Sequence, residues 1–235
     1  MIKLNIAVLC AIILSSCSKS IKQLETPVLP DQFPIERYTT TNSPSVFRVD
    51  ALQSQVLVTV RRGGLMAKLG HDHIVSSRQL QGFILMDQDS QRCHADFYIP
   101  VHLIEVDNPQ LRAQAQMQTT PSDRDIAGTR INMLKSIDAE QFPFVQLRSA
   151  DCSEIFINSS VTIEIQFHGV IQKQQIDLYW HRDTKGVLTA QSTFSLLQTD
   201  FNIAPFSIMN GLIKVEDRLE IAVQLTAYPL GTTRQ

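Results

Sequence analysis

The residue pattern best suited to chemistry is a pair of histidines around one aspartate, His71-Asp72-His73, directly after Gly70. Two imidazoles placed two positions apart on an extended strand point to the same face, and this is how β-structures hold a transition-metal ion. A good site needs at least one further ligand, for which the sequence offers His94, His102 and His168. The pattern therefore predicts a metal site on His71 and His73.

Two other interpretations of this histidine pair stay open. In one, the first imidazole caps the glycine turn and the second is solvated at the rim of the folded domain. In the other, both imidazoles form hydrogen bonds with the polar headgroup of a ligand. Nothing in the spacing of the residues separates these interpretations from metal binding.

Catalytic motifs are missing from the sequence. It has no G-x-S-x-G elbow, no H-E-x-x-H pair and no glycine-rich phosphate loop. The carboxylates of Asp123 and Asp125 lie at an expected helix start, where the helix dipole favours acidic residues, and Asp200 stands alone. A formal net charge of −2 provides no basic face for nucleic acid. We therefore expect neither an enzyme nor a nucleic-acid partner.

The N-terminus has the pattern of an export signal. A positive Lys3 precedes an apolar stretch, residues 4–14, that is far shorter than the ~20 residues needed to span a bilayer. Leu14-Ser15-Ser16-Cys17 resembles the bacterial lipobox, although a plain signal peptide that happens to contain a cysteine is an alternative. We predict a lipoprotein signal peptide over residues 1–16 and lipid attachment at Cys17. Ser18, in place of aspartate, favours a periplasm-facing outer-membrane lipoprotein over an inner-membrane one.

The remaining cysteines form one pair. Cys10 leaves with the signal and Cys17 carries lipid, so Cys93 and Cys152 remain in the exported chain. An even pair in an oxidising compartment predicts a disulfide, although two buried free thiols fit the sequence as well.

Composition divides the mature chain into a tether and a domain. Residues 17–44 carry several prolines and little periodic pattern, which is typical of a lipidated tether. Residues 45–230 alternate between apolar and polar positions, the pattern of antiparallel strands with one dry and one wet face. Turn residues at regular intervals predict a barrel or sandwich of roughly eight strands.

The alternation also names the dry faces. The residues expected to face inward, as candidates for a cavity lining, are Val161, Ile163, Ile165, Phe167, Phe97, Ile99, Val101, Ile221 and Val223. On the strand through Phe97, Cys93, Ala95 and Leu103 share the dry face, whereas Arg92, His94, Asp96, Tyr98 and His102 are expected on the wet face. A barrel of this size can be filled by its own side chains or can hold one ligand, and the pattern allows both.

One stretch interrupts the strands. The alternation stops over residues 107–137, where Asn108-Pro109 predicts a helix entry and Ser122 with Asp125 predicts a capping box. We expect one or two helices here, between the third and fourth long strands, covering an end of the barrel.

Several segments together resemble the YceI-like family. They are Phe47-Arg48-Val49-Asp50 with Ser54-Gln55-Val56, the junction at residues 133–143, the hairpin at residues 163–174, and residues 194–203. The resemblance spans about residues 46–228 and implies a lipocalin-like antiparallel β-barrel, all-β apart from a short helical insert. It also implies an exported protein of the polyisoprenoid-binding type. Two features depart from the family pattern. Asn202 replaces a common glycine, and residues 68–73 form a variant segment that contains Gly-His-Asp-His.

These features together predict a lipid-anchored binding protein that holds an amphiphilic lipid or isoprenoid in a barrel cavity. The expected partners are a hydrophobic small molecule and the membrane, with an oligomer possible. No cofactor is expected beyond that lipid. The alternatives are a metal-binding periplasmic protein that uses His71 and His73, or a non-enzymatic stress-related module that binds partners through the outer sheet or the helical insert.

Overall fold

The computed structural model describes residues 29–39 and 45–230. The predicted signal peptide (residues 1–16), the lipid attachment at Cys17 and residues 18–28 and 40–44 of the predicted tether lie outside this described part. Within it, antiparallel strands dominate, with three α-helices and five short 3-10 turns. The predicted fold class, all-β with a short helical insert, is confirmed.

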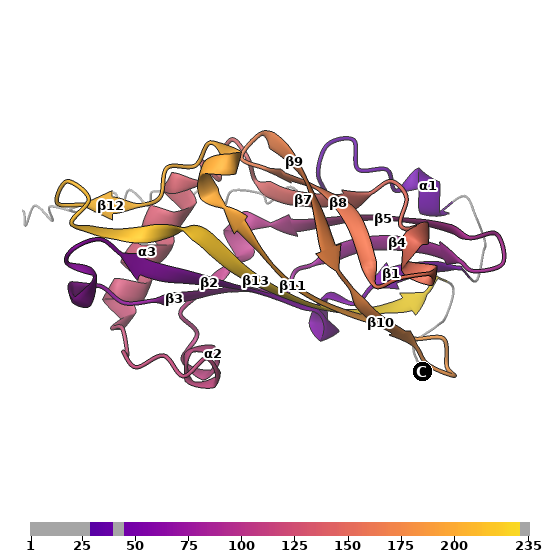
Figure 1. The fold of residues 1–235 in the computed structure, drawn as a ribbon, viewed down its shortest axis with the longest axis horizontal. Helices are drawn as coiled ribbons and strands as arrows, with labels where there is room; N and C mark the ends of the chain where they lie inside the picture. Colours follow the sequence, from indigo (N-terminus) through magenta and orange to yellow (C-terminus); the bar gives the residue numbers. More distant parts are fainter. Residues whose placement is uncertain (1–28, 40–44, 231–235) are drawn as a thin grey trace, which may run out of the picture.

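The strands form one continuous antiparallel sheet (Figure 1). They are β1 (Val46–Val49), β2 (Gln55–Gly63), β3 (His73–Ser77), β4 (Gln81–Asp87), β5 (Arg92–Pro100), β6 (Glu105–Val106), β7 (Phe144–Ser149), β8 (Ser160–Phe167), β9 (Val170–Asp177), β10 (Tyr179–Arg182), β11 (Leu188–Leu197), β12 (Ser207–Ile208) and β13 (Ile213–Pro229). The α-helices are α1 (Glu36–Thr39), α2 (Pro109–Gln114) and α3 (Asp123–Ser136). The 3-10 turns are η1 (Ala51–Gln53), η2 (Ala67–Leu69), η3 (Val101–Leu103), η4 (Ser153–Phe156) and η5 (Gln198–Phe201).

The expected count of roughly eight strands is wrong, because four long strand paths are each broken in two. β1 and β2 follow one another along the same edge of β13 and are separated by η1. In the same way β3 continues into β4, β5 passes through η3 into β6, and β9 is followed by β10 after Leu178. Thirteen strands minus these four breaks and the two-residue β12 leave eight paths. Two of the breaks are 3-10 turns, η1 and η3, and the other two are short irregular segments, none of which a period-two pattern marks.

These eight paths close into a barrel. From β13 the ladder runs through β1 and β2, then β3 and β4, then β5, β7, β8 and β9. The circle closes because β10, which continues β9, pairs with β11, and β11 pairs with β13 over ten register positions. β9 and β11 are joined by hydrogen bonds from side chains. Gln174 donates to the Ser195 carbonyl (3.1 Å), and Ser192 donates to the Asp177 carbonyl (2.6 Å). Closure satisfies strand edges that would otherwise stay open.

The helical insert lies between β6 and β7, as predicted. Asn108 caps α2, and at α3 the Ser122 side chain and the Asp125 side chain form the reciprocal capping box. Figure 1 shows α3 at the same end of the barrel as β12, whereas α1 lies toward the opposite end, beside β4 and β5. No helix in residues 29–39 and 45–230 is long and apolar enough to cross a membrane.

The outer face of β5 is the main departure from the expected pattern. Asp96 and Tyr98, expected on a wet face, are 2% and 5% exposed. They are covered by residues 29–39, so the prediction of a tether is wrong for this segment. Phe33 packs edge-on against Tyr98 (ring centroids 4.9 Å apart), and Tyr38 stacks on Phe83 (5.3 Å). The packed domain therefore includes residues 29–39 in addition to residues 45–230.

Asp96 connects this N-terminal segment to the barrel. Its Oδ2 accepts hydrogen bonds from the Tyr38 hydroxyl (2.7 Å) and Arg37 Nη1 (3.2 Å), and its Oδ1 accepts one from Arg148 Nε (2.8 Å). Burial, together with the hydrogen bond to the Asp96 carboxylate, raises the pKa of Tyr38 far above its usual value. The buried carboxylate is thus paired with two cations and one hydroxyl, which burial of a charge requires.

The run of inward-facing residues that begins on β5 also stops earlier than expected. Leu103, expected inside, is 48% exposed because η3 rotates the chain out of the strand after Pro100.

Replacing Tyr38 with phenylalanine removes one donor from Asp96 and leaves the ring packing in place. We expect Y38F to lower the free energy of unfolding by about 2 kcal/mol, because the buried carboxylate of Asp96 then loses one of its three hydrogen-bond donors. Urea unfolding of the purified protein measures this. The control is Y179F on β10, whose side chain is 70% exposed, and it should leave the midpoint unchanged. Equal effects of the two variants would contradict the role assigned to Asp96.

Candidate ligand cavity and histidine cluster

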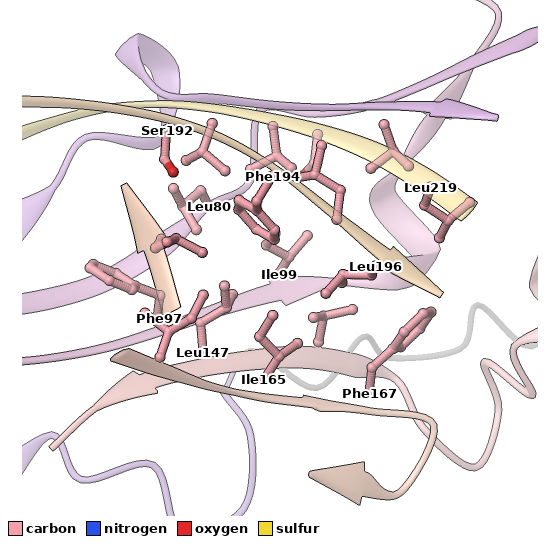
Figure 2. A pocket seen from close by; sticks show the side chains of 18 of the residues that line it. Leu80, Phe97, Ile99, Leu147, Ile165, Phe167, Ser192, Phe194, Leu196 and Leu219 are labelled. Atoms are coloured by element: carbon pink, nitrogen blue, oxygen red, sulfur yellow. The ribbon is translucent and has the colours of Figure 1, made fainter. Parts of the chain in front are cut away.

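The interior of the barrel holds a cavity of about 370 Å³. This volume lies within the range of roughly 300–1,000 Å³ typical of small-molecule sites. Figure 2 shows aliphatic and aromatic side chains converging on it from opposite walls, with Leu80 and Phe194 facing Phe97, Leu147 and Ile165. The barrel is therefore hollow, a question that the sequence pattern left open.

All nine predicted lining residues point into this cavity. Val161, Ile163, Ile165 and Phe167 come from β8, Phe97 and Ile99 from β5, Val101 from η3, and Ile221 and Val223 from β13. Sequence reasoning missed the contributions of β7, β11 and α3, among them Leu147, Phe194, Leu196 and Met133. The β11 residues follow the same alternation and were open to prediction, whereas the α3 residues depend on how the helix crosses the barrel end.

One end of the cavity is closed. There Cys93 and Cys152 form a disulfide between β5 and the start of η4. Cys93, Cys152, Ile155 and Leu188 are all buried members of the core that surround this end. The disulfide, one of two interpretations of the sequence, thus lies in the cavity floor and its sulfurs contribute to an apolar lining.

The opposite end is the mouth. Along β8 and β11 the lining residues change from buried, at Val161 and Leu188, to half-buried, at Phe167 and Leu196. Phe206, just before β12, is 39% exposed and still lines the cavity. Because α3 and β12 lie at this end (Figure 1), the mouth is the part of the barrel that the helical insert borders.

Polar groups gather at the mouth. Thr129 and Asn132 of α3 contribute to the lining, and so does His73 at the start of β3. The register places His73 opposite Val60, which in turn pairs with Leu219, so His73 stands near the half-buried end of the strands. Deeper in, the lining hydroxyls of Ser149 and Ser192 donate to backbone carbonyls, so the cavity combines a mostly apolar interior with polar groups at the mouth, the arrangement expected of a ligand site.

The histidine pair forms a compact cluster at this rim. The rings of His71 and His73 lie 4.5 Å apart between centroids. Asp107 joins them: its Oδ2 lies 2.7 Å from His73 Nδ1, and one potential ligand atom of each of the three residues lies within 4.8 Å of the others. Burial and the neighbouring His73 lower the pKa of His71 below its ordinary value.

The expectation that His94, His102 or His168 completes this cluster is wrong. His94 lies on β5, with its ring against Tyr38, and His102 lies in η3. His168 lies in the β8–β9 turn, where Nδ1 bonds the Phe201 carbonyl. For His94 the physical reason is its position along the strand path: it pairs with Leu85 near the start of β5, whereas β6, at the far end of the same path, is the part that pairs with β3.

Asp107 was missed because the pairing of the two-residue strand β6 with β3 leaves no periodic signal. That pairing matches Val106 with Val75, so the next residue, Asp107, arrives beside Ile74 and His73. Its backbone N–H donates to the Ile74 carbonyl (2.7 Å), and its Oδ1 accepts from the Ile74 N–H (3.0 Å). One feature of the sequence could have pointed to it: Asp107 directly precedes Asn108, the expected cap of a helix, and an acidic residue there can pair with a histidine.

Arg112 fixes Asp107 in this position. It is buried, and its Nη1 donates to Asp107 Oδ1 (2.5 Å) and to the Asp72 carbonyl (2.7 Å), while the other guanidinium nitrogens bond Thr119. Burial alone raises the pKa of Asp107, but the hydrogen bond and charge of His73, the Ile74 N–H and Arg112 together hold it below its ordinary value. Asp107 is therefore an ionised carboxylate with both oxygens engaged.

Solved structures share this architecture at low sequence identity. A polyisoprenoid-binding domain from Saccharophagus degradans, implicated in plant cell wall breakdown, aligns over 78% of this chain and 98% of its own with 10% identity and a TM-score of 0.54. BcnA of Burkholderia cenocepacia aligns over 76% and 98% with 13% identity and a TM-score of 0.51. A Campylobacter jejuni YCEI protein aligns over 63% and 79% with 13% identity, but its TM-score of 0.40 is too low to support an argument.

No family model and no curated protein matches the sequence. The likeness to known proteins is thus structural, and it concerns the fold. The first two of these solved structures share the antiparallel barrel fold of this chain, in agreement with the fold class that the sequence resemblance implied.

The disulfide in the cavity floor should stabilise the barrel. It closes a loop with a sequence separation of 59 residues, for which chain entropy predicts a contribution of about 4 kcal/mol. We expect the double variant C93A/C152A to lose stability by roughly that amount in denaturant unfolding. Treating the unchanged protein with a reductant should reproduce the loss. If the double variant unfolds at the same denaturant concentration as the oxidised protein, the bridge contributes nothing.

Proposed function

We propose that this protein binds an amphiphilic lipid, of the isoprenoid type or with a similar single apolar tail, inside the barrel. The observation that supports it best is the cavity of about 370 Å³, lined almost throughout by aliphatic and aromatic side chains that become more exposed toward the end bordered by α3. Each methylene removed from water contributes ~0.8 kcal/mol, so a tail gains affinity with length even without polar contacts.

The asymmetry of the cavity supports one orientation of the ligand. The tail enters first and ends at the floor formed by Cys93, Cys152 and Leu188, where every side chain is buried. The headgroup remains at the mouth, beside Thr129 and Asn132 of α3, where hydrogen-bonding groups line the opening. Carriage rather than chemical conversion of the ligand is proposed, in keeping with the polyisoprenoid-binding name of one structural neighbour and with the missing catalytic motifs.

We also propose that the barrel is held at the membrane through its N-terminus. The support is the sequence alone: a signal peptide at residues 1–16, a lipobox that ends at Cys17, and Ser18 in place of aspartate. These features favour a periplasm-facing outer-membrane lipoprotein. Such an anchor would keep a lipid-binding barrel close to the bilayer from which its ligand comes.

The test is to place a large side chain inside the cavity and to compare its effect on lipid binding with that of the same side chain on the opposite face of the strand. Val223 of β13 lines the cavity, whereas its neighbour Gln224 is exposed. V223W should weaken binding of a fluorescent isoprenoid tenfold or more, equivalent to about 1.4 kcal/mol, because the indole occupies the space of the tail. Q224W should bind as the unchanged protein does.

Native mass spectrometry of the gently purified protein provides a second measurement. We expect a mass increment from co-purified lipid that disappears in V223W and persists in Q224W. Equal lipid binding by the two tryptophan variants, both shown to be folded, would overturn the proposal.

A further inference from the structure

Two imidazoles at the cavity mouth have nitrogens without hydrogen-bond partners. His71 Nε2 is buried and makes no hydrogen bond within the described residues. Leaving a buried polar atom unpaired costs free energy, so such an atom in a native fold calls for an explanation. His94 and His102 also carry an unpaired buried Nε2. Of these three histidines, His71 alone belongs to a group of potential metal ligands within the described residues, together with His73 and Asp107.

The second imidazole is held with one nitrogen free. His73 Nδ1 lies 2.7 Å from Asp107 Oδ2, and because the carboxylate is the acceptor, Nδ1 is the donor and carries the ring proton of the neutral imidazole. The lone pair is then on Nε2, for which the described residues provide no hydrogen bond. A carboxylate behind a histidine is the usual support of a metal-binding imidazole, because it fixes the tautomer and raises the basicity of the ligand nitrogen.

Asp107 serves as this support rather than as a ligand. Its Oδ1 already accepts from Arg112 and from the Ile74 N–H, and its Oδ2 accepts from His73. Arg112 in turn bonds the Asp72 carbonyl, which lies between the two histidines in the chain, so one buried cation fixes both the carboxylate and the backbone of the pair.

We propose that His71 and His73 bind one divalent transition-metal ion at the mouth of the cavity, with Asp107 as the positioning residue for His73. The ring centroids, 4.5 Å apart, are close enough for both imidazoles to reach a single ion. Imidazole donors select zinc, copper, nickel or cobalt over calcium or magnesium, which prefer oxygen ligands.

Two properties of the cluster favour this occupant. The buried Nε2 of His71 makes no hydrogen bond within the described residues, so this nitrogen is open to a metal ion. The pairing of Asp107 with Arg112 leaves little net charge, so the site attracts an ion through its nitrogen donors rather than through excess negative charge. Because His73 also lines the cavity, the remaining coordination positions of the ion lie beside the opening through which a ligand passes.

The experiment uses the full chain, purified without a histidine tag and stripped with a chelator, and titrates it with Co²⁺ alone. We expect one ion per chain at micromolar affinity, with a visible absorption band, and competition by Zn²⁺. The double variant H71A/H73A should bind at least about 100-fold more weakly, whereas H181A, a control at an exposed histidine on β10, should bind normally.

Asp107 is tested separately. D107N keeps the size of the side chain but removes the charge behind His73, so affinity should fall by about 10- to 100-fold and the Co²⁺ band should change in intensity. Thermal unfolding of each metal-free variant verifies that the barrel is intact. Wild-type binding weaker than roughly 100 μM, or binding unaffected by H71A/H73A, overturns the site, and an unchanged Co²⁺ band in D107N overturns the positioning role. No lipid is added, and the metal variants leave Val223 unchanged, so these results can be told apart from the V223W test of lipid binding.

Discussion

Closure of the backbone ladder is the constraint on which the rest of this structure depends. β13 (Ile213–Pro229) is the longest strand; it pairs along one edge with β2 and β1 and along the other with β11. Once both edges are occupied, alternate side chains on every path must face a common interior. Eight paths enclose more space than those side chains fill, so the apolar alternation produces a cavity as well as a core.

Two polar groups that the closed barrel buries have hydrogen-bond partners, one on its outer face and one in its wall. Outside, Asp96 is buried only because residues 29–39 cover it and supply Arg37 and Tyr38 as partners. Inside, Ser192 is buried and bonded to the Asp177 carbonyl, which leaves its hydroxyl satisfied within the wall. The interior therefore stays apolar from the disulfide floor to the rim, a property that a hydrocarbon ligand requires.

The rim is where the fold permits different chemistry. β3 begins there and the two-residue β6 ends there, and the chain then turns at Asp107 into α2 and α3. This turn brings an ionised carboxylate and a buried arginine beside two histidines, next to an opening lined by α3. The proposed lipid site and the proposed metal site thus share one mouth, although each depends on different residues.

The sequence by itself determined the features that depend on local spacing. The nine residues that period-two alternation placed inside all line the cavity, the capping box marked the start of α3, and the sequence resemblance pointed to the fold. Tertiary structure alone decided what depends on distant pairing: the breaks that divide eight paths into thirteen strands, the cover over Asp96, and Asp107 as the partner of His73. The physical reason is that alternation reports which side of a strand is dry, whereas strand order and chain crossings decide which residues, 34 or 58 positions apart, come into contact.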